Sequence, residues 1–518
     1  MSNNRPNIRN ALNTKRADDF SKWYQEVISA ADLAEESGVR GCMVIKPWGY
    51  GIWERIQRLL DDRIKAAGVQ NTYFPLFIPL ANFEREAEHV DGFAKEMAVV
   101  THHRLIAGAD GKLIPDPEAK LEEPLVVRPT SETIIGDAMA RWTQSWRDLP
   151  LMLNQWGNVV RWEMRTRMFL RTSEFLWQEG HTAHATQDEA KSETHRALEM
   201  YRACAEEDLA LPVVAGEKPE NERFPGAVET WSIEAMMQDG KALQAGTSHY
   251  LGTNFAKAAG IQYQDRDGLQ TLCHTTSWGV STRMIGGVIM THGDDDGLRV
   301  PPRIAPFQIV ILPMLRDKPE DDALLDYCEE IRAGLSSQTC MGEPVRVLLD
   351  KTPGKASAKR WDWVRKGAPV IIEVGPRDME NGNVAMLRRD ALWDTETGKL
   401  ATAFPERDAF LGDACGLLEA IQTALFSQAA ERRDANITRG LTQWDAVVDH
   451  FKNGGKYPGW VEVEWAKPTG DALTKVVEKL KAIQLTIRNV PREGEPASGT
   501  CIFTGEPAVE RILVARAY

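Results

Sequence analysis

The order of apolar and polar residues predicts a protein that mixes helices and strands. Apolar side chains recur at helical spacing over residues 53–65 and 186–210, and residues 18–37 fit an acidic amphipathic helix. A strand is predicted over residues 72–79, between prolines, and a helix from Ser131 to about Trp146. The other predicted strands lie within residues 125–181 and, with glycine punctuation, from about 226 to 292.

The pattern changes at the proline-rich segment 301–306. Beyond it, alternating strands and helices predict a compact α/β unit; its strands are expected at 309–312, 345–349 and 370–374, with a helix at 320–337. One long helix over 408–435 then connects to a small C-terminal unit, with strands at 461–465 and 510–516 and a helix at 471–483. The predicted domains are 1–302, 303–407 and 408–518.

Residues 101–124 are polar and rich in glycine, proline and acidic groups, which predicts an exposed loop. The seven cysteines are scattered and form no Cys-x-x-Cys pair. A disulfide framework is therefore not expected in a chain of 518 residues, and reduced thiols are the simpler interpretation.

Composition narrows the possible partners. The N-terminal residues lack the apolar region of a signal peptide, and no uninterrupted apolar run has the length of a membrane span. These features predict a cytoplasmic protein without a membrane partner. The net charge of -13 argues against unspecific nucleic-acid binding, but it permits a local basic surface for one RNA.

A possible nucleotide site lies near the middle of the chain. Arg161 and Glu163 are two residues apart, so they project from the same face of a strand. A loop containing Arg165, Arg167 and Arg171 follows, and a second strand rich in aromatic residues returns. Guanidinium groups suit phosphate, and a carboxylate can accept a hydrogen bond from an adenine amino group. An edge hairpin with a solvated basic tip is the alternative interpretation.

Five segments, in order, point to a known family. They are residues 51–79 with Pro75, Arg-Pro-Thr-Ser-Glu at 128–132, the hairpin 161–181, Gln-Ala-Gly-Thr-Ser-His at 244–249, and Gly-Val-Ser-Thr-Arg at 279–283 with 292–302 behind it. Together they resemble the class II aminoacyl-tRNA synthetases, and specifically prolyl-tRNA synthetases of the archaeal/eukaryotic type without the bacterial editing insertion. Each segment is weak evidence alone, whereas the ordered set is specific.

The resemblance implies an α+β fold. An antiparallel-sheet catalytic domain would be followed by an α/β anticodon-binding domain and a small C-terminal α/β domain. It also implies ATP-dependent ligation of L-proline to tRNA(Pro) through a prolyl-adenylate. Mg²⁺ would bridge the phosphates with few protein ligands. A homodimer would form through the first segment, the family's motif 1.

The resemblance also assigns site residues. Arg161 would hold the α-phosphate and Arg283 the γ-phosphate of a bent ATP, as the two catalytic residues. The ATP-binding residues would be Arg161, Glu163, Arg171, Thr172, Phe175, Gln244, Thr247 and Arg283. The proline-binding residues would be Phe93, Thr130, Glu132, Arg161, Trp177, Glu179, His181, His249 and Ser281. Structural roles remain the alternatives for the two histidines, and a core position for Phe175.

The chain departs from the family in several places. Residues 182–278 leave no room for an editing domain, so we expect alanine activation without hydrolysis of alanyl-tRNA. Cys501 stands where relatives hold zinc with four cysteines, so no zinc is expected. Val364 and Ile371 replace usual anticodon-domain residues, leaving four basic residues as possible base readers or as a solvated face. They are Arg360, Arg365, Lys366 and Arg377. The role of the C-terminal Tyr518 is left open.

Two other functions remain open from the sequence. A paralogue could load prolyl-adenylate onto a carrier protein, and a non-catalytic module could bind RNA. Retention of Arg161, Glu163 and Arg283 disfavours the second, and an anticodon domain of full length disfavours the first. Proline-dependent ATP–pyrophosphate exchange followed by tRNA charging separates the three.

Overall fold

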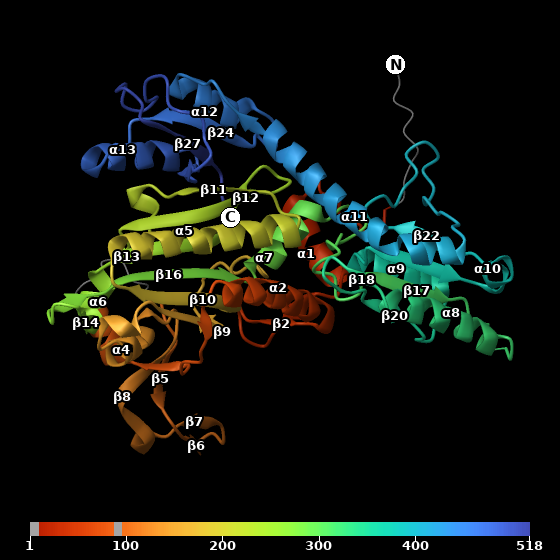
Figure 1. The fold of residues 1–518 in the computed structure, drawn as a ribbon, viewed down its shortest axis with the longest axis horizontal. Helices are drawn as coiled ribbons and strands as arrows, with labels where there is room; N and C mark the ends of the chain where they lie inside the picture. Colours follow the sequence, from red (N-terminus) through yellow and green to blue (C-terminus); the bar gives the residue numbers. More distant parts are fainter. Residues whose placement is uncertain (1–9, 88–95, 317) are drawn as a thin grey trace.

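A computed structural model describes residues 10–87, 96–316 and 318–518. At its centre lies one eight-stranded sheet (Figure 1), antiparallel except where its last two strands run parallel. In sheet order the strands are β26 (Val490–Pro491), β11 (Val213–Glu217), β12 (Glu229–Met236), β13 (Ala242–Gly252), β16 (His274–Ser281), β10 (Glu174–His184), β9 (Leu151–Val160) and β3 (Gln70–Asn71). The antiparallel catalytic sheet expected from the resemblance is confirmed.

Helices flank this sheet. They are α1 (Phe20–Ala30), α2 (Pro47–Ala66), α3 (Leu80–Ala87), α4 (Glu132–Trp142), α5 (Gln187–Ala203), α6 (Asn254–Ala259) and α7 (Arg283–His292). Helix α5 begins in a capping box made by Thr186 and Glu189, and it packs on β13 and β16. Small antiparallel pairs lie beside these elements: β1 (Ala34–Glu36) with β2 (Met43–Ile45), and β14 (Gln262–Gln264) with β15 (Gln270–Leu272).

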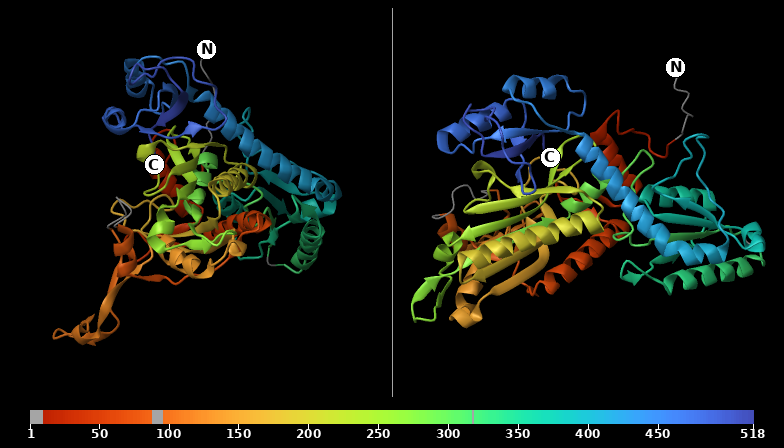
Figure 2. Two further views of the ribbon diagram at one scale, coloured as in Figure 1. Left: turned by 60° about the vertical axis from the view of Figure 1, so that its left-hand side comes forward. Right: turned by 45° about the horizontal axis from the view of Figure 1, so that its top comes forward.

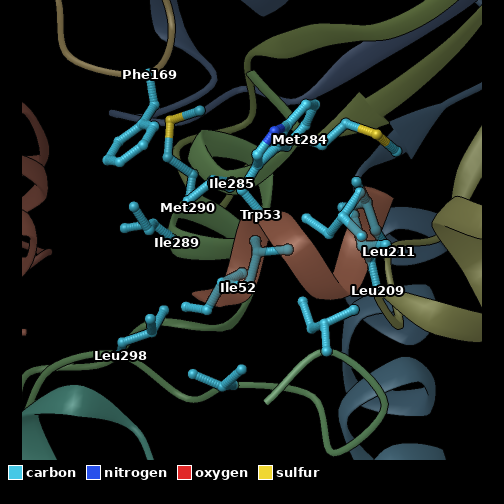
Figure 3. Close-up of a cluster of buried hydrophobic side chains, with 14 of the residues drawn as sticks. Ile52, Trp53, Phe169, Leu209, Leu211, Met284, Ile285, Ile289, Met290 and Leu298 are labelled. Carbon is cyan, nitrogen blue, oxygen red and sulfur yellow. The ribbon is translucent and has the colours of Figure 1, made fainter. Parts of the chain in front are cut away.

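Helix α7 is anchored in the main hydrophobic core. Ile52 and Trp53 of α2 lie together with Met284 and Ile285 of α7 (Figure 3), and all four are buried. Every residue of α7 after the first is buried. The helix therefore holds its first residue, Arg283, in a fixed position, because a close-packed core resists displacement.

The loop expected over residues 101–124 is a wrong prediction. These residues form an arm that projects from the body (Figure 2). Its strands are β4 (Phe77–Pro79), β5 (Val99–His102), β6 (Leu105–Ala107), β7 (Leu113–Pro115) and β8 (Lys120–Val127). Ile106 lies opposite Ile114 across the β6–β7 hairpin, and the short apolar pairs at 105–106 and 113–114 remain exposed. Polar residues separate these apolar pairs, so the sequence does not show the alternation typical of strands.

A second sheet follows Pro301. Its order is β20 (Val347–Leu349), β17 (Ile309–Pro313), β21 (Val370–Val374) and β22 (Ala385–Arg388), parallel except for β22. All residues of β17 and β21 are buried, as expected for a sheet with helices on its faces. Its helices are α8 (Asp321–Ser336), α9 (Ala356–Lys366) and α10 (Pro376–Asn381). Val364 and Ile371 are buried in this core.

Helix α11 (Arg407–Ala435) runs diagonally from this unit to the C-terminal one (Figure 1). By length and composition it is the one helix, within the described ranges, that could cross a membrane. The sequence prediction concerned uninterrupted apolar runs, and charged residues interrupt α11, so this finding does not contradict it. Packing explains its apolar residues: Phe410, Leu418 and Leu425 enter the core around α8, and the Gln422 side chain donates to the Glu207 carbonyl at 2.8 Å.

The C-terminal sheet has the order β23 (Ile437–Thr438), β24 (Trp460–Trp465), β27 (Glu510–Ala515) and β25 (Thr486–Ile487), with helices α12 (Trp444–Asn453) and α13 (Gly470–Lys481). The segment behind β25 then leaves this unit. It becomes β26 and pairs with β11. The C-terminal unit is thereby joined to the edge of the catalytic sheet.

Other boundaries and one cysteine prediction are also corrected. The first helix ends at Ala30 rather than 37, because β1 begins at Ala34; the predicted strand 72–79 is reduced to β4; and the helix after Ser131 ends at Trp142. The expectation of reduced thiols is wrong for one pair, because Cys340 and Cys415 form a disulfide with their Cα atoms 5.3 Å apart. The two cysteines are 75 residues apart in the sequence. Cys340 ends β18 (Thr339–Cys340), which pairs with β19 (Glu343–Pro344), and Cys415 lies in α11. The two elements come together only in the folded chain.

Candidate active site

One face of the central sheet carries a cavity of about 240 Å³. Strand register brings its residues together: Trp177 of β10 lies opposite Ser281 of β16, and Thr247 of β13 lies opposite Gly279. A second cavity of about 150 Å³ adjoins it, because Arg161, Phe175, Ser281 and Arg283 line both. The two predicted arginines, 122 positions apart in the sequence, therefore meet at one site.

Carboxylates define one end of the larger cavity. The Thr130 hydroxyl donates to the Glu132 carboxylate at the start of α4. The buried Glu179 carboxylate accepts from the Ser131 hydroxyl at 2.6 Å and from the Gln155 amide at 2.8 Å. Glu132 has one bond to a neighbour, whereas Glu179 is held by several, so Glu132 is the freer acceptor.

His181 completes the bonding of Glu179. Its Nε2 lies 3.1 Å from Glu179 Oε2, and both side chains are buried. Burial lowers the pKa of His181, but the hydrogen bond and charge of Glu179 outweigh it, so the pKa is raised. Burial likewise raises the pKa of Glu179, and the bonds from His181, Ser131 and Gln155 reverse that shift, so the pKa is lowered. Both shifts favour the charged forms, so we expect the two groups to form a buried ion pair.

His249 is different in charge. Burial, and then the charge of His181, lower its pKa to about 3, so the ring is neutral at neutral pH. The ring stacks on Phe224 at 4.7 Å, and its Nδ1 lies 3.0 Å from the Thr230 hydroxyl. This histidine forms an uncharged wall of the cavity.

The cavity also carries arginines. Arg161 Nε donates to the Pro129 carbonyl at 2.9 Å, and its guanidinium lies 5.4 Å from the Trp177 ring and 5.6 Å from the Phe175 ring. Arg283 Nε donates to the Leu170 carbonyl at 3.1 Å. Among the described residues, neither guanidinium has a carboxylate partner within salt-bridge distance.

Burial, reinforced by Arg161 and Arg171, lowers the pKa of Arg283 to about 10. An arginine that carries its charge against burial and like charge is stabilised by an arriving anion. Glu163 and Thr172 line the second cavity, and Arg171 Nε lies 4.0 Å from Glu163 Oε2. Gln244 and Thr247 line the larger one. This end is therefore built for a polyanion.

All but one of the predicted site residues line these two cavities. The exception is Phe93, which lies outside the described residues. Sequence reasoning missed Glu222, Arg223 and Phe224, which line the larger cavity from the loop after β11. They stand in a polar stretch without a recognisable motif, so only the folded chain reveals them. The Trp177 indole nitrogen is buried and finds no acceptor among the described residues, which leaves a donor for a ligand.

Comparisons with known proteins agree with this geometry. Residues 116–292 match the tRNA synthetase class II core domain (G, H, P, S and T), and residues 308–405 match an anticodon binding domain. The chain is 74% identical to the proline–tRNA ligase of Erythrobacter litoralis (strain HTCC2594), over 99% of this chain and 100% of that one. It is 57% identical to that of Paramagnetospirillum magneticum (strain AMB-1), over 98% and 99%.

Solved structures are also similar. The prolyl-tRNA synthetase of Cryptosporidium parvum complexed with halofuginone and AMPPNP aligns with a TM-score of 0.87 at 34% identity, over 98% of this chain and 97% of that one. A second crystal structure of that enzyme, complexed with L-proline and AMP, aligns with a TM-score of 0.86 at 34% identity, over the same shares of the two chains.

The sheet, the paired arginines and the domain matches define a class II aminoacyl-tRNA synthetase. Identity over the full length places the chain more narrowly: it belongs to the proline–tRNA ligase family. It is an ATP-using enzyme that ligates proline to tRNA.

Proposed function

We propose that the two cavities bind ATP and proline as the family resemblance implies. The single observation that supports this most is that Arg161 and Arg283 converge on one cavity that Glu132 and Glu179 also line. Arg161 binds the α-phosphate and Arg283 the γ-phosphate, with Arg171 and Gln244 beside them. Proline places its ammonium at Glu132 and Thr130, and its ring between Trp177 and His249.

The chemistry then needs little from the protein except position and charge. The proline carboxylate attacks the α-phosphate in line, which gives prolyl-adenylate and pyrophosphate, and Arg161 stabilises the charge on the α-phosphate oxygens. The tRNA(Pro) 3′ end next accepts the prolyl group. Mg²⁺ would be held mainly by the phosphate oxygens of ATP, and Glu163, which lines the smaller cavity, could offer it a carboxylate. It supplies further charge neutralisation when bound.

Proline-dependent ATP–pyrophosphate exchange, followed by charging of tRNA with a proline anticodon, tests this proposal. Exchange and charging are both expected. Exchange without charging would favour a carrier-protein acceptor, and absence of exchange would overturn the site. Val364 and Ile371 are buried, and buried side chains do not read bases, so the anticodon would be read by other residues. Arg360 pairs with Glu373 and Arg365 with Asp362, each at 2.9 Å, and Lys366 lies 4.0 Å from Asp32. Among the described residues, Arg377 is therefore the one of the four without an ion pair, and we propose it first as a base reader.

We further propose that the enzyme is of the archaeal/eukaryotic type and lacks editing. The chain between β10 and β16 is taken up by α5, α6 and strands β11 to β15, which belong to the catalytic unit. Purified enzyme is expected to activate alanine and to leave alanyl-tRNA intact. Hydrolysis of that tRNA without a second protein would contradict the proposal.

We propose three domains, at 1–302, 303–407 and 408–518, and a cytoplasmic homodimer formed through motif 1. The arm beside that motif supports the dimer, since Leu105 and Leu113 are 58% and 71% exposed. Sedimentation of Leu113→Asp against wild type tests it, with a dimer expected only for wild type.

No structural zinc is proposed, because Cys501 is a lone cysteine and Ala466 stands where a further ligand is expected. Metal analysis of purified protein decides this.

A further inference from the structure

A buried cluster of three charges lies beside the proposed ATP site. Lys218 Nζ is 2.6 Å from Glu234 Oε1, and Arg488 Nη2 is 2.8 Å from Glu234 Oε2. The side chains of Lys218, Glu234 and Arg488 are 1%, 0% and 7% exposed. Two cations share one carboxylate, so the cluster retains one net positive charge.

The cluster is on the same face of the sheet as the cavity. Thr230, Ser232 and Glu234 alternate along β12, and Thr230 lines the cavity, so Glu234 points to that side. Glu234 is also the cross-strand neighbour of Gln244, which lines the cavity. Electrostatic coupling supports the proximity, because Glu234 raises and Arg488 lowers the pKa of Arg283, although burial is the larger cause of its shift.

Arg488 comes from the C-terminal unit and is held firmly. Its backbone amide donates to the Leu513 carbonyl of β27 at 2.7 Å. Its Nη1 donates to the Thr486 hydroxyl at 2.8 Å, and the side-chain Nδ2 of the next residue, Asn489, donates to the Val214 carbonyl at 3.0 Å. The guanidinium therefore reaches the catalytic sheet at a fixed point.

Neutrality does not require Arg488, because Lys218 alone balances Glu234. A buried ion that exceeds neutrality is costly, and an apolar residue of similar size is the cheaper filling. We propose that Arg488 is a positioning residue for ATP: it gives the Lys218–Glu234–Arg488 cluster a net positive charge that attracts the triphosphate toward Gln244 and Arg283. The C-terminal unit thereby completes the ATP site without touching the nucleotide. This inference rests on the proposed location of ATP.

The test compares two substitutions of Arg488 in the full-length enzyme by ATP–pyrophosphate exchange. Arg488→Gln keeps hydrogen-bond donors and removes the charge, so we expect the KM for ATP to rise about three- to tenfold, while the KM for proline stays within about twofold. Arg488→Lys keeps the charge and is expected to restore the KM for ATP. Equal rises in both KM values, or no rise for ATP, would overturn the proposal.

Two further variants separate charge from structure. Glu234→Gln removes a negative charge from the cluster, so the KM for ATP should not rise, whereas a purely structural contact predicts a rise as large as that of Arg488→Gln. Arg511→Gln is the matched control, because Arg511 pairs with Glu464 and Glu495 within the C-terminal unit; only its melting temperature should fall. If Arg488→Gln does not fold, Arg488→Lys and Glu234→Gln still decide, and a raised KM for ATP in both contradicts the proposal.

Failure of this inference is distinguishable from failure of the ATP site. If Arg283→Ala raises the KM for ATP while Arg488→Gln leaves it unchanged, only the role of Arg488 is wrong. If Arg283→Ala leaves the KM for ATP unchanged, the location of ATP itself is wrong.

Discussion

The two ends of the catalytic cavity satisfy their charges in opposite ways. At the proline end, Glu179 is bonded to Ser131, Gln155 and His181 and forms a buried ion pair inside the protein. At the triphosphate end, Arg161 and Arg283 each use only Nε, toward backbone carbonyls, within the described residues. At the proline end, Glu179 is paired before substrate arrives and Glu132 is left for the substrate, whereas at the triphosphate end neither arginine has a carboxylate partner among the described residues. The proline end therefore contains a preformed hydrogen-bond network, and the triphosphate end contains positive charge for an anionic ligand to neutralise.

The largest effect is expected from Arg283→Ala. The Nη groups of this side chain have no hydrogen bond among the described residues and are left for phosphate, and removing such a preorganised donor costs about 10²–10³-fold in rate. We expect that loss in kcat/KM for ATP in the exchange assay. Proline binding, measured by calorimetry without ATP, should change less than about threefold. A comparable loss of proline affinity would show that the two ends are not separate.

Glu132→Gln removes a negative charge from the proline end of the cavity. Its carboxylate accepts only the Thr130 hydroxyl among the contacts that the structure records, which leaves it free for the ammonium of proline. Losing one partner of a close charge pair costs about 2–5 kcal/mol, so the KM for proline should rise at least about thirtyfold, with the KM for ATP nearly unchanged. Thr133→Ser, on the same helix turn, serves as the control. A rise in the KM for ATP alone would contradict this assignment.

The comparison also explains what the sequence could predict. The antiparallel sheet, the parallel unit and the long helix follow from apolar periodicity, and Arg161 and Arg283 follow from ordered motifs. The β6–β7 arm was missed because its apolar pairs are short and stay exposed. Phe224, Lys218 and Glu234 were missed because each acts through a cross-strand or long-range contact, which no local spacing encodes. Arg488 lies 254 residues from its partner Glu234.

The ion pair at the proline end predicts a pH dependence. The pKa of His181 is raised, so its stabilisation is complete below the ordinary value near 6.5 and is lost as the pH rises through the folded pKa. The pKa of Glu179 is lowered, so its contribution is present above the ordinary value near 4.5 and is lost as the pH falls through the folded pKa.

His181→Gln tests this dependence by removing the cation. A hydrogen bond to a charged group contributes about 1.5–3 kcal/mol, so the variant should unfold more easily by that amount at pH 6. The difference from wild type in urea-unfolding free energy should shrink as the pH rises above the folded pKa of His181. His450→Gln is the control, since His450 Nε2 contacts only the Pro458 carbonyl in the C-terminal unit. A pH-independent difference would mean that the pair is not ionised.

The smallest effect concerns the support of the triphosphate end. The C-terminal Tyr518 donates its hydroxyl to Asp239 at 2.5 Å, and its ring lies 5.1 Å from Arg167 in the loop that follows Arg161. Tyr24 stacks on the same guanidinium at 4.8 Å. Tyr518→Phe keeps the ring and loses one hydrogen bond, so the KM for ATP should rise less than about twofold.

Tyr518→Ala also removes the ring and should raise the KM for ATP about two- to fourfold, because a cation–π contact contributes about 0.5–1 kcal/mol at partly exposed sites. The KM for proline should not move in either variant, since no residue of the tail lines the larger cavity among the described residues. If Tyr518→Ala also raised the KM for proline, the C-terminal tail would support the whole cavity. The two ends would then differ in their charges but share the same supporting elements.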